Sequence, residues 1–116
     1  MLGDISGAGS IYIITGYTDM RKSIDGLCAI ISEQMKMDPA SNALYLFCGK
    51  RCDRIKAIYK EIDGFVLIYK RLSVQQGRYR WPRNKSEVRD LTWQEFGWLT
   101  SGLGIDQPKA IKTREN

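Results

Sequence analysis

The chain has 116 residues, 43% of them apolar, and carries 18 basic against 13 acidic side chains, for a net charge of +5. This length suits one domain with one core, so a two-lobed enzyme with a cleft between its lobes is excluded. No apolar run approaches the roughly 20 residues that span a bilayer, and residues 1–16 lack the pattern of a secretory signal. An odd count of three Cys with no export signal predicts reduced thiols and a cytoplasmic location. The absence of His removes the commonest proton shuttle near neutral pH and the commonest zinc ligand.

The positive charge is concentrated in the middle of the chain. Residues 1–49 carry three basic and five acidic groups (−2), residues 50–90 carry twelve and five (+7), and residues 91–116 carry three of each. A dense basic block suits a polyanion, because each neutralised phosphate releases condensed counterions. A solvated surface rich in Lys and Arg, which keeps the protein soluble, is the alternative interpretation.

The first third of the chain predicts a strand and then a long helix. We expect a flexible lead-in over residues 1–10, which are rich in Gly and Ser, and a buried strand at the apolar run Ile11–Ile14. Apolar residues with helical spacing predict a helix over about 19–37, capped by Thr18 or Asp19. These apolar residues are Ile24, Leu27, Cys28, Ile31 and Met35.

From residue 43 onward the pattern changes to strands joined by turns. We expect strands at about 44–48, 54–61, 65–72 and 77–81. Asp63-Gly64 is a strong hairpin signal, and with these two residues at the centre of the turn, paired positions sum to 127. Thr92 and Glu95 form a capping box for a helix over about 92–103. We expect the domain to occupy residues 11–106, followed by a polar tail at 107–116.

The expected hairpin register separates two faces of the sheet. The face assigned to the core, against which the long helix packs, holds Ile55, Ala57, Tyr59, Val66, Ile68 and Leu72. On the other face, Lys56 lies opposite Arg71, and a bound anion would relieve their repulsion. The fold class is therefore α+β: a single domain with an antiparallel β-meander of about 4–5 strands, one long N-terminal helix on a face, and a shorter C-terminal helix.

Two basic segments are candidates for contact with nucleic acid. In a strand from Gly77 to Trp81, the arginines share one face and the aromatic rings the other. The arginines can hold phosphates, while the rings fill a core or stack on bases. A second cluster lies at an expected hairpin tip, where side chains can straddle a backbone. An edge strand protected by arginines and an ordinary solvated turn are the alternatives. The candidate residues are Lys50, Arg51, Arg54, Lys56, Lys70, Arg71, Arg78, Arg80 and Trp81.

The sequence offers little for catalysis or metal binding. Cys48 and Cys52 have a metal-like spacing, but only Cys28 remains to join them and no His can complete a zinc site. Acidic residues are scattered over expected caps and turns, and no Ser or Cys has a visible base partner. We expect no catalytic residue, no metal and no cofactor.

An ordered series of short motifs resembles a known family. The motifs are Thr18-Asp19-Met20-Arg21-Lys22, Ile24-Asp25-Gly26-Leu27, Leu44 to Phe47, Asp53-Arg54-Ile55-Lys56, Asp63-Gly64-Phe65, Lys70-Arg71-Leu72 and Gly77 to Pro82. Over roughly residues 11–106 the chain resembles TnpB, the second-open-reading-frame protein of insertion sequence 66 elements. The resemblance implies a small accessory protein of a bacterial transposable element, encoded beside the transposase and needed for movement of the element, with DNA binding as an expectation.

These observations predict a non-catalytic accessory protein that binds DNA, at transposon ends or target, through a basic sheet surface. Its expected partners are DNA, the transposase and another element-encoded accessory protein, with no membrane. The alternative is an assembly module that docks on the transposase or another accessory subunit without DNA contact, using Phe65, Leu67 and Tyr69 as anchors. RNA is a third possible partner.

Overall fold

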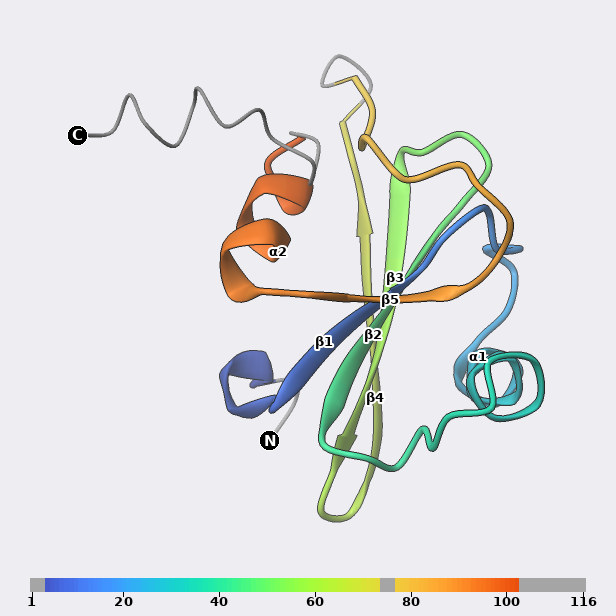
Figure 1. Ribbon diagram of the computed structural model, residues 1–116, viewed down its shortest axis with the longest axis vertical. Coiled ribbons are helices and arrows are strands. Elements are labelled where there is room, and N and C mark those ends of the chain that lie inside the picture. Colours follow the sequence, from blue (N-terminus) through green and yellow to red (C-terminus); the bar gives the residue numbers. More distant parts are fainter. Residues whose placement is uncertain (1–3, 74–76, 103–116) are drawn as a thin grey trace.

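The computed structural model describes residues 4–73 and 77–102, and it shows one five-stranded sheet with a helix on each of its two faces (Figure 1). The strands are β1 (Ser10–Ile14), β2 (Ala43–Cys48), β3 (Arg54–Glu61), β4 (Gly64–Arg71) and β5 (Val88–Leu91). The helices are α1 (Ile24–Ala29), which continues as a π-helical segment Ile30–Gln34, and α2 (Trp93–Thr100). The first four strands lie close to their predicted positions.

The sheet is mixed, so the prediction of a purely antiparallel meander is wrong. Its order is β4-β3-β2-β1-β5, and β1 runs parallel to β2, with Ile11 beside Leu44. All other neighbours are antiparallel. Two strands in parallel need a crossover connection, and here the chain makes it through α1. The helix predicted between the first two strands was therefore itself the signal for a parallel pair.

The fifth strand lies at a different place from the one predicted. Residues 77–81 form no strand, although their side chains alternate as expected, and β5 at Val88–Leu91 pairs with β1 instead. The Tyr79 amide donates to the carbonyl of Cys52 (2.7 Å), and the Pro82 carbonyl accepts from the amide of Gly16 (2.9 Å). Because these bonds go to loops, the segment crosses the end of the sheet.

Helix α1 is shorter than the predicted 19–37 and begins five residues later. Asp19 does not cap it. Its carboxylate instead accepts from the backbone amide (2.9 Å) and guanidinium (2.8 Å) of Arg21, and these bonds lower the pKa of Asp19 to about 2. The Thr18 amide donates to the Cys48 carbonyl (2.8 Å). The segment before α1 is thus bound to the end of β2.

The β3–β4 register differs from the predicted one by two residues. Paired positions sum to 125, so Glu61 lies opposite Gly64, and Arg71 lies opposite Arg54 rather than Lys56. Ile62 and Asp63 form the turn, and Gly64 does not adopt the left-handed backbone conformation that an Asp-Gly turn uses. A shift of two keeps every side chain on its predicted face.

Both faces of the sheet are buried, and α1 covers the face opposite to the one predicted. The core under α1 and its π-helical extension contains Ile14, Leu27, Ile30, Ile31, Ala43, Tyr45, Phe47 and Ile58, with Phe65 and Leu67 half-buried at its border. The core under α2 contains Ile11, Ile13, Leu44, Leu46, Cys48, Ile55, Ala57, Tyr59, Tyr79, Trp81, Leu91 and Leu99. Helix α1 covers one face as the crossover between β1 and β2, and α2, which follows β5, covers the other.

The predicted capping box of α2 is confirmed. The Thr92 hydroxyl accepts from the Glu95 amide (3.0 Å), and the Glu95 carboxylate accepts from the Thr92 amide (2.8 Å). Residues 1–3, the helix end at 103 and the tail at 107–116 lie outside the described residues; Ile5–Gly7 form a short 3-10 turn. Within the described ranges no helix combines the length and apolar character needed to cross a membrane.

Candidate nucleic-acid interface

An open groove lies at the end of the sheet where β2 ends, β3 begins and β4 ends. The β2–β3 loop forms one side, closed by a hydrogen bond from the Cys52 amide to the Gly49 carbonyl (2.9 Å). The segment 77–83 forms the other side, and the end of β4 is joined to the loop by the Leu72 amide, which donates to the Asp53 carbonyl (2.8 Å). Three stretches distant in sequence therefore share one surface.

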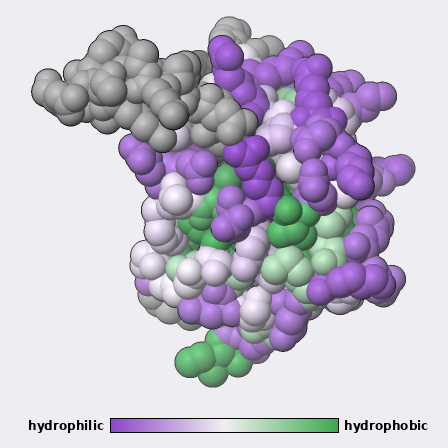
Figure 2. Space-filling view, viewed as in Figure 1, coloured by the Kyte–Doolittle hydropathy of each residue, from purple (hydrophilic) through white to green (hydrophobic). Residues whose placement is uncertain are grey.

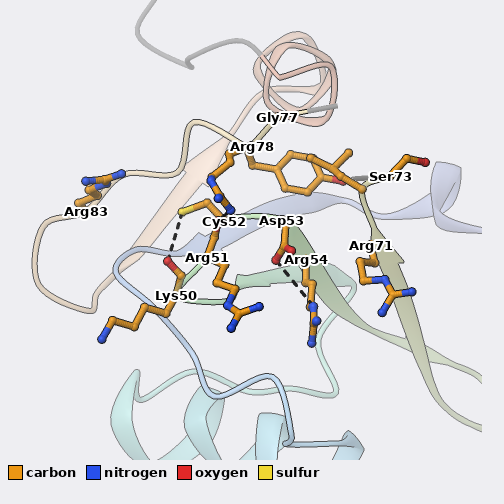
Figure 3. A pocket seen from close by; sticks show the side chains of 12 residues that line it. Lys50, Arg51, Cys52, Asp53, Arg54, Arg71, Ser73, Gly77, Arg78 and Arg83 are labelled. Carbon is orange, nitrogen blue, oxygen red and sulfur yellow. Dashed lines mark hydrogen bonds and ion pairs between the residues drawn. The ribbon is translucent and has the colours of Figure 1, made fainter. Parts of the chain in front are cut away.

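Six cationic side chains line this groove, which has a volume of about 890 Å³ (Figure 3). They are Lys50, Arg51, Arg54, Arg71, Arg78 and Arg83. The one carboxylate among the lining residues is Asp53, so the lining carries six positive charges against one negative. Figure 2 shows hydrophilic side chains gathered over the end of the molecule that holds the β2–β3 loop. We call this surface the basic groove.

Within residues 4–73 and 77–102, one ion pair involves a cation of the groove, that between Arg54 and Asp53. Asp53 lies 3.7 Å from Nε of Arg54, and this Nε is buried with no hydrogen-bond partner in the part of the chain that the structure describes. Arg71 lies directly across the strand pair from Arg54, where like charges repel. Figure 3 shows the side chains of Arg51, Arg54 and Arg71 pointing the same way among the residues that line the groove. Among the residues that line the groove, six cations face the single carboxylate of Asp53, which favours a bound anion.

Arg78 is oriented by the loop opposite to it. Its guanidinium donates to the backbone carbonyl of Arg51 (2.7 Å), so it joins the two sides of the groove. A guanidinium has five N–H donors, and this bond leaves others for a ligand. Arg78 therefore both holds the loop and contributes charge.

Two aromatic residues of the segment 77–83 are buried and anchor it to the core. Tyr79 is 3% exposed and Trp81 4%, and the Trp81 indole donates to the Ile14 carbonyl (2.9 Å). Burial raises the pKa of Tyr79, whose hydroxyl has no hydrogen-bond partner among the described residues. Trp81 is thus part of the core, so its ring fills the core and is not exposed for stacking on bases.

The structure brings together five of the nine predicted residues: Lys50, Arg51, Arg54, Arg71 and Arg78. Lys70 lines an adjoining hollow with Arg71 and Arg78. Lys56 lies apart on the α1 face, where its ammonium donates to the Lys22 carbonyl (2.8 Å) and lies 5.4 Å from the centre of the Tyr69 ring. Arg80 is exposed but is not among the residues lining the groove.

Arg83 lines the groove although it was not among the predicted residues. It follows Pro82, where the sequence predicted the end of a strand; the sequence placed Arg83 near a phosphate-facing patch with Lys70 and Arg71, but in no defined element. Its proximity in sequence to the Arg-Tyr-Arg-Trp run was the available signal. Whether Arg83 lines the groove depends on the path of the loop after residue 82, which sequence periodicity does not describe.

The cysteines provide no metal centre in the described part of the chain. All three thiols are free, and burial raises the pKa of the Cys48 thiol, with a further contribution from Cys52 beside it. No group of three or more Cys, Asp or Glu side chains could hold a metal ion within residues 4–73 and 77–102.

Comparison with known proteins adds a family to this geometry. A family model described as IS66 Orf2-like protein matches residues 9–110. The chain belongs to this family. The resemblance seen in the motifs is thereby confirmed, and membership of the IS66 Orf2-like proteins supports an accessory role in transposition.

Two relatives from Sinorhizobium fredii (strain NBRC 101917 / NGR234) align over most of their length. Uncharacterized protein y4jC is 31% identical over 103 residues, which cover 89% of this chain and 86% of the relative. Uncharacterized protein y4hO is 29% identical over 99 residues, which cover 85% and 84%. No solved structure matches the chain.

Proposed function

We propose that this member of the IS66 Orf2-like family is a non-catalytic accessory protein that binds duplex DNA through the phosphates at the basic groove. Cutting and joining of DNA are the work of a separate transposase. The observation that carries the proposal is the convergence of six cations from three separate segments on one open surface with a single carboxylate.

The chemistry of the lining suits phosphodiesters. Guanidinium groups bind phosphate oxygens through paired N–H donors, and ammonium groups add charge without strict geometry. Arg54 and Arg71 repel each other across the strand pair, and a phosphate between them would remove that cost. Each phosphate contact also releases condensed counterions, so binding should weaken steeply as salt is raised.

Contact with the backbone of a duplex is favoured over contact with unpaired bases. Proteins that bind single strands stack bases on exposed aromatic rings. Tyr79 is the aromatic residue among those lining the groove, and it is almost fully buried. Phosphate contacts carry no sequence information by themselves, so the choice of transposon ends falls to another component, with the transposase as the expected partner.

The docking alternative has less support from the fold. Phe65 and Leu67 are half-buried at the border of the core under α1, which leaves Tyr69, 50% exposed, as the accessible member of the three anchors. A hydrophobic interface needs a cluster of such side chains.

Fluorescence anisotropy of labelled duplexes across a salt series tests the proposal. The double variant Arg51→Ala/Arg83→Ala removes two exposed cations and leaves the Arg51 carbonyl, which binds Arg78, in place. We expect the slope of log affinity against log salt to become shallower by about one unit for each lost phosphate contact, hence by about two. A single-stranded probe of the same sequence should bind more weakly.

Arg80→Ala and Lys36→Asn are the matched controls. Arg80 shares a segment with Arg83 but does not line the groove, and Asn tolerates the left-handed backbone at Lys36, where φ is 58°. Both should leave the slope unchanged. Binding that is undetectable or independent of salt would remove the DNA role, and an equal loss in the controls would remove the groove as its location.

A further inference from the structure

Strand β4 forms one open edge of the sheet. It lies at the end of the strand order and has β3 as its neighbour, and no other strand in the described ranges lies beyond it. It is eight residues long and contains no proline. Edge strands of this length present a row of unpaired backbone groups, which are a template for pairing with another strand.

The hydrogen bonds of the hairpin show which backbone groups point outward. The Leu72 amide donates to the Asp53 carbonyl, and in an antiparallel pair the bonded positions alternate. Even-numbered positions of β4 therefore bond to β3. The N–H and C=O groups of Phe65, Leu67, Tyr69 and Arg71 point away from the sheet.

We propose that β4 pairs antiparallel with β4 of a second copy of this chain, with Leu67 on the twofold axis. In this register the outward-pointing groups of one copy meet those of the other, with Leu67 opposite Leu67 and Phe65 opposite Tyr69. Asp63, in the turn just before β4, then comes beside Arg71 of the other copy. Each backbone-bonded pair exchanges two hydrogen bonds.

The side chains select this register. Asp63 and Arg71 are both exposed and have opposite charge, while Phe65 and Tyr69 form an aromatic pair, a favourable combination across strands. A shift of two residues in either direction separates Asp63 from Arg71 and Phe65 from Tyr69. The two ends of β4 are thus complementary to each other in an antiparallel arrangement, which is what a twofold contact requires.

The pairing would give one particle with two basic grooves. Each Arg71 lies four residues from the axis, so the two lie about 26 Å apart along the strands at about 3.3 Å per residue. The guanidinium of Arg71 retains further donors after it meets one carboxylate, and five other cations line each groove.

The test reverses the charge of Asp63 or of Arg71 and measures dimerisation of the full chain, without DNA, by analytical ultracentrifugation. We expect a dimer for the wild type at micromolar concentration. Asp63→Arg alone places two arginines opposite each other, and Arg71→Asp alone places two aspartates opposite each other. For each variant we expect the dissociation constant of the dimer to rise about tenfold or more. An equimolar mixture of the two variants should recover the dimer, because both of its mixed pairs have opposite charge.

A backbone variant tests the same contact in another way. Tyr69→Pro removes an outward N–H and spares the bonds to β3, whereas Tyr69→Thr removes the same ring and keeps the N–H. We expect the dissociation constant of the dimer to rise markedly more in Tyr69→Pro than in Tyr69→Thr. Asp90→Arg, on the opposite edge strand, should leave the dimer unchanged.

A monomeric wild type would overturn the proposal. A dimer that is weakened neither by Asp63→Arg or Arg71→Asp nor by Tyr69→Pro would also overturn it. These measurements contain no DNA. Their failure would leave the basic groove proposal intact, and failure of DNA binding would leave this one intact.

Discussion

At the scale of single residues, Trp81 illustrates how the arginine-bearing segment is held in place. Its indole donates to the carbonyl of Ile14 at the end of β1, and the next carbonyl along the segment, that of Pro82, accepts from Gly16. Alternation along residues 78–81 predicted rings on one side and arginines on the other, and this is what the structure shows. Periodicity could not say whether the ring side meets a core or a ligand.

Trp81→Phe separates these two roles. The phenyl ring fills most of the space but leaves the Ile14 carbonyl without its donor, so we expect the free energy of unfolding to fall by about 1–3 kcal/mol in urea titrations. The salt dependence of DNA binding should stay as in the wild type. A loss of DNA affinity without a loss of stability would instead indicate that the ring stacks on bases.

At the scale of elements, the β2–β3 loop depends on contact with the segment before α1. A Cβ atom at Gly49 would lie 2.6 Å from Cγ of Met20, and the neighbouring Cys48 carbonyl accepts from the Thr18 amide. Cys52 completes the loop with a left-handed backbone, φ 56°. The loop that carries Lys50 and Arg51 is therefore shaped by a close approach that sequence patterns do not reveal.

Gly49→Ala should destabilise the fold by about 1–3 kcal/mol, because Met20 or the loop must move to make room. Gly64→Ala is the matched control, since in the described ranges no heavy atom outside its chain neighbours lies within 4 Å of the added Cβ. Thermal denaturation of the two variants beside the wild type provides the comparison. Equal midpoints for both would show that Met20 yields without cost.

At the scale of the whole molecule, the charge is unevenly placed. One end holds the basic groove, and the other ends in the β3–β4 turn, where Ile62 is fully exposed and Figure 2 shows a hydrophobic projection. Like charges gathered in the groove repel one another in the free protein. An anion that binds there stabilises the folded state by mass action.

Inorganic phosphate should therefore raise the unfolding temperature of the wild type above its value in chloride of equal ionic strength. This rise in unfolding temperature should be smaller in Arg51→Ala/Arg83→Ala, which has fewer repelling cations. In Lys36→Asn it should be as large as in the wild type. Differential scanning calorimetry measures all three proteins. The same increase in every variant would mean that phosphate acts on the solvent or at another surface.

Local patterns were sufficient for several parts of this protein. Apolar runs located β1 to β4, and Asp63-Gly64 located the β3–β4 turn, with a register two residues away from the observed one. The spacing from Ile24 to Met35 indicated a helix that contains α1 but is longer than it, and Thr92 with Glu95 located the start of α2. These features depend on contacts within a few residues, which is why a sequence displays them. The motif series also indicated the family, and the family model confirms it.

The chain's own sequence determined its periodic elements, its family and the presence of a surplus of cations between residues 50 and 90. Tertiary structure alone decided that β1 runs parallel to β2, that Val88–Leu91 is the fifth strand, and that Arg83 joins the groove while Lys56 and Trp81 do not. The reason is physical. Strand partners and loop paths are set by burial and hydrogen bonds between residues far apart in sequence, and no local pattern records them.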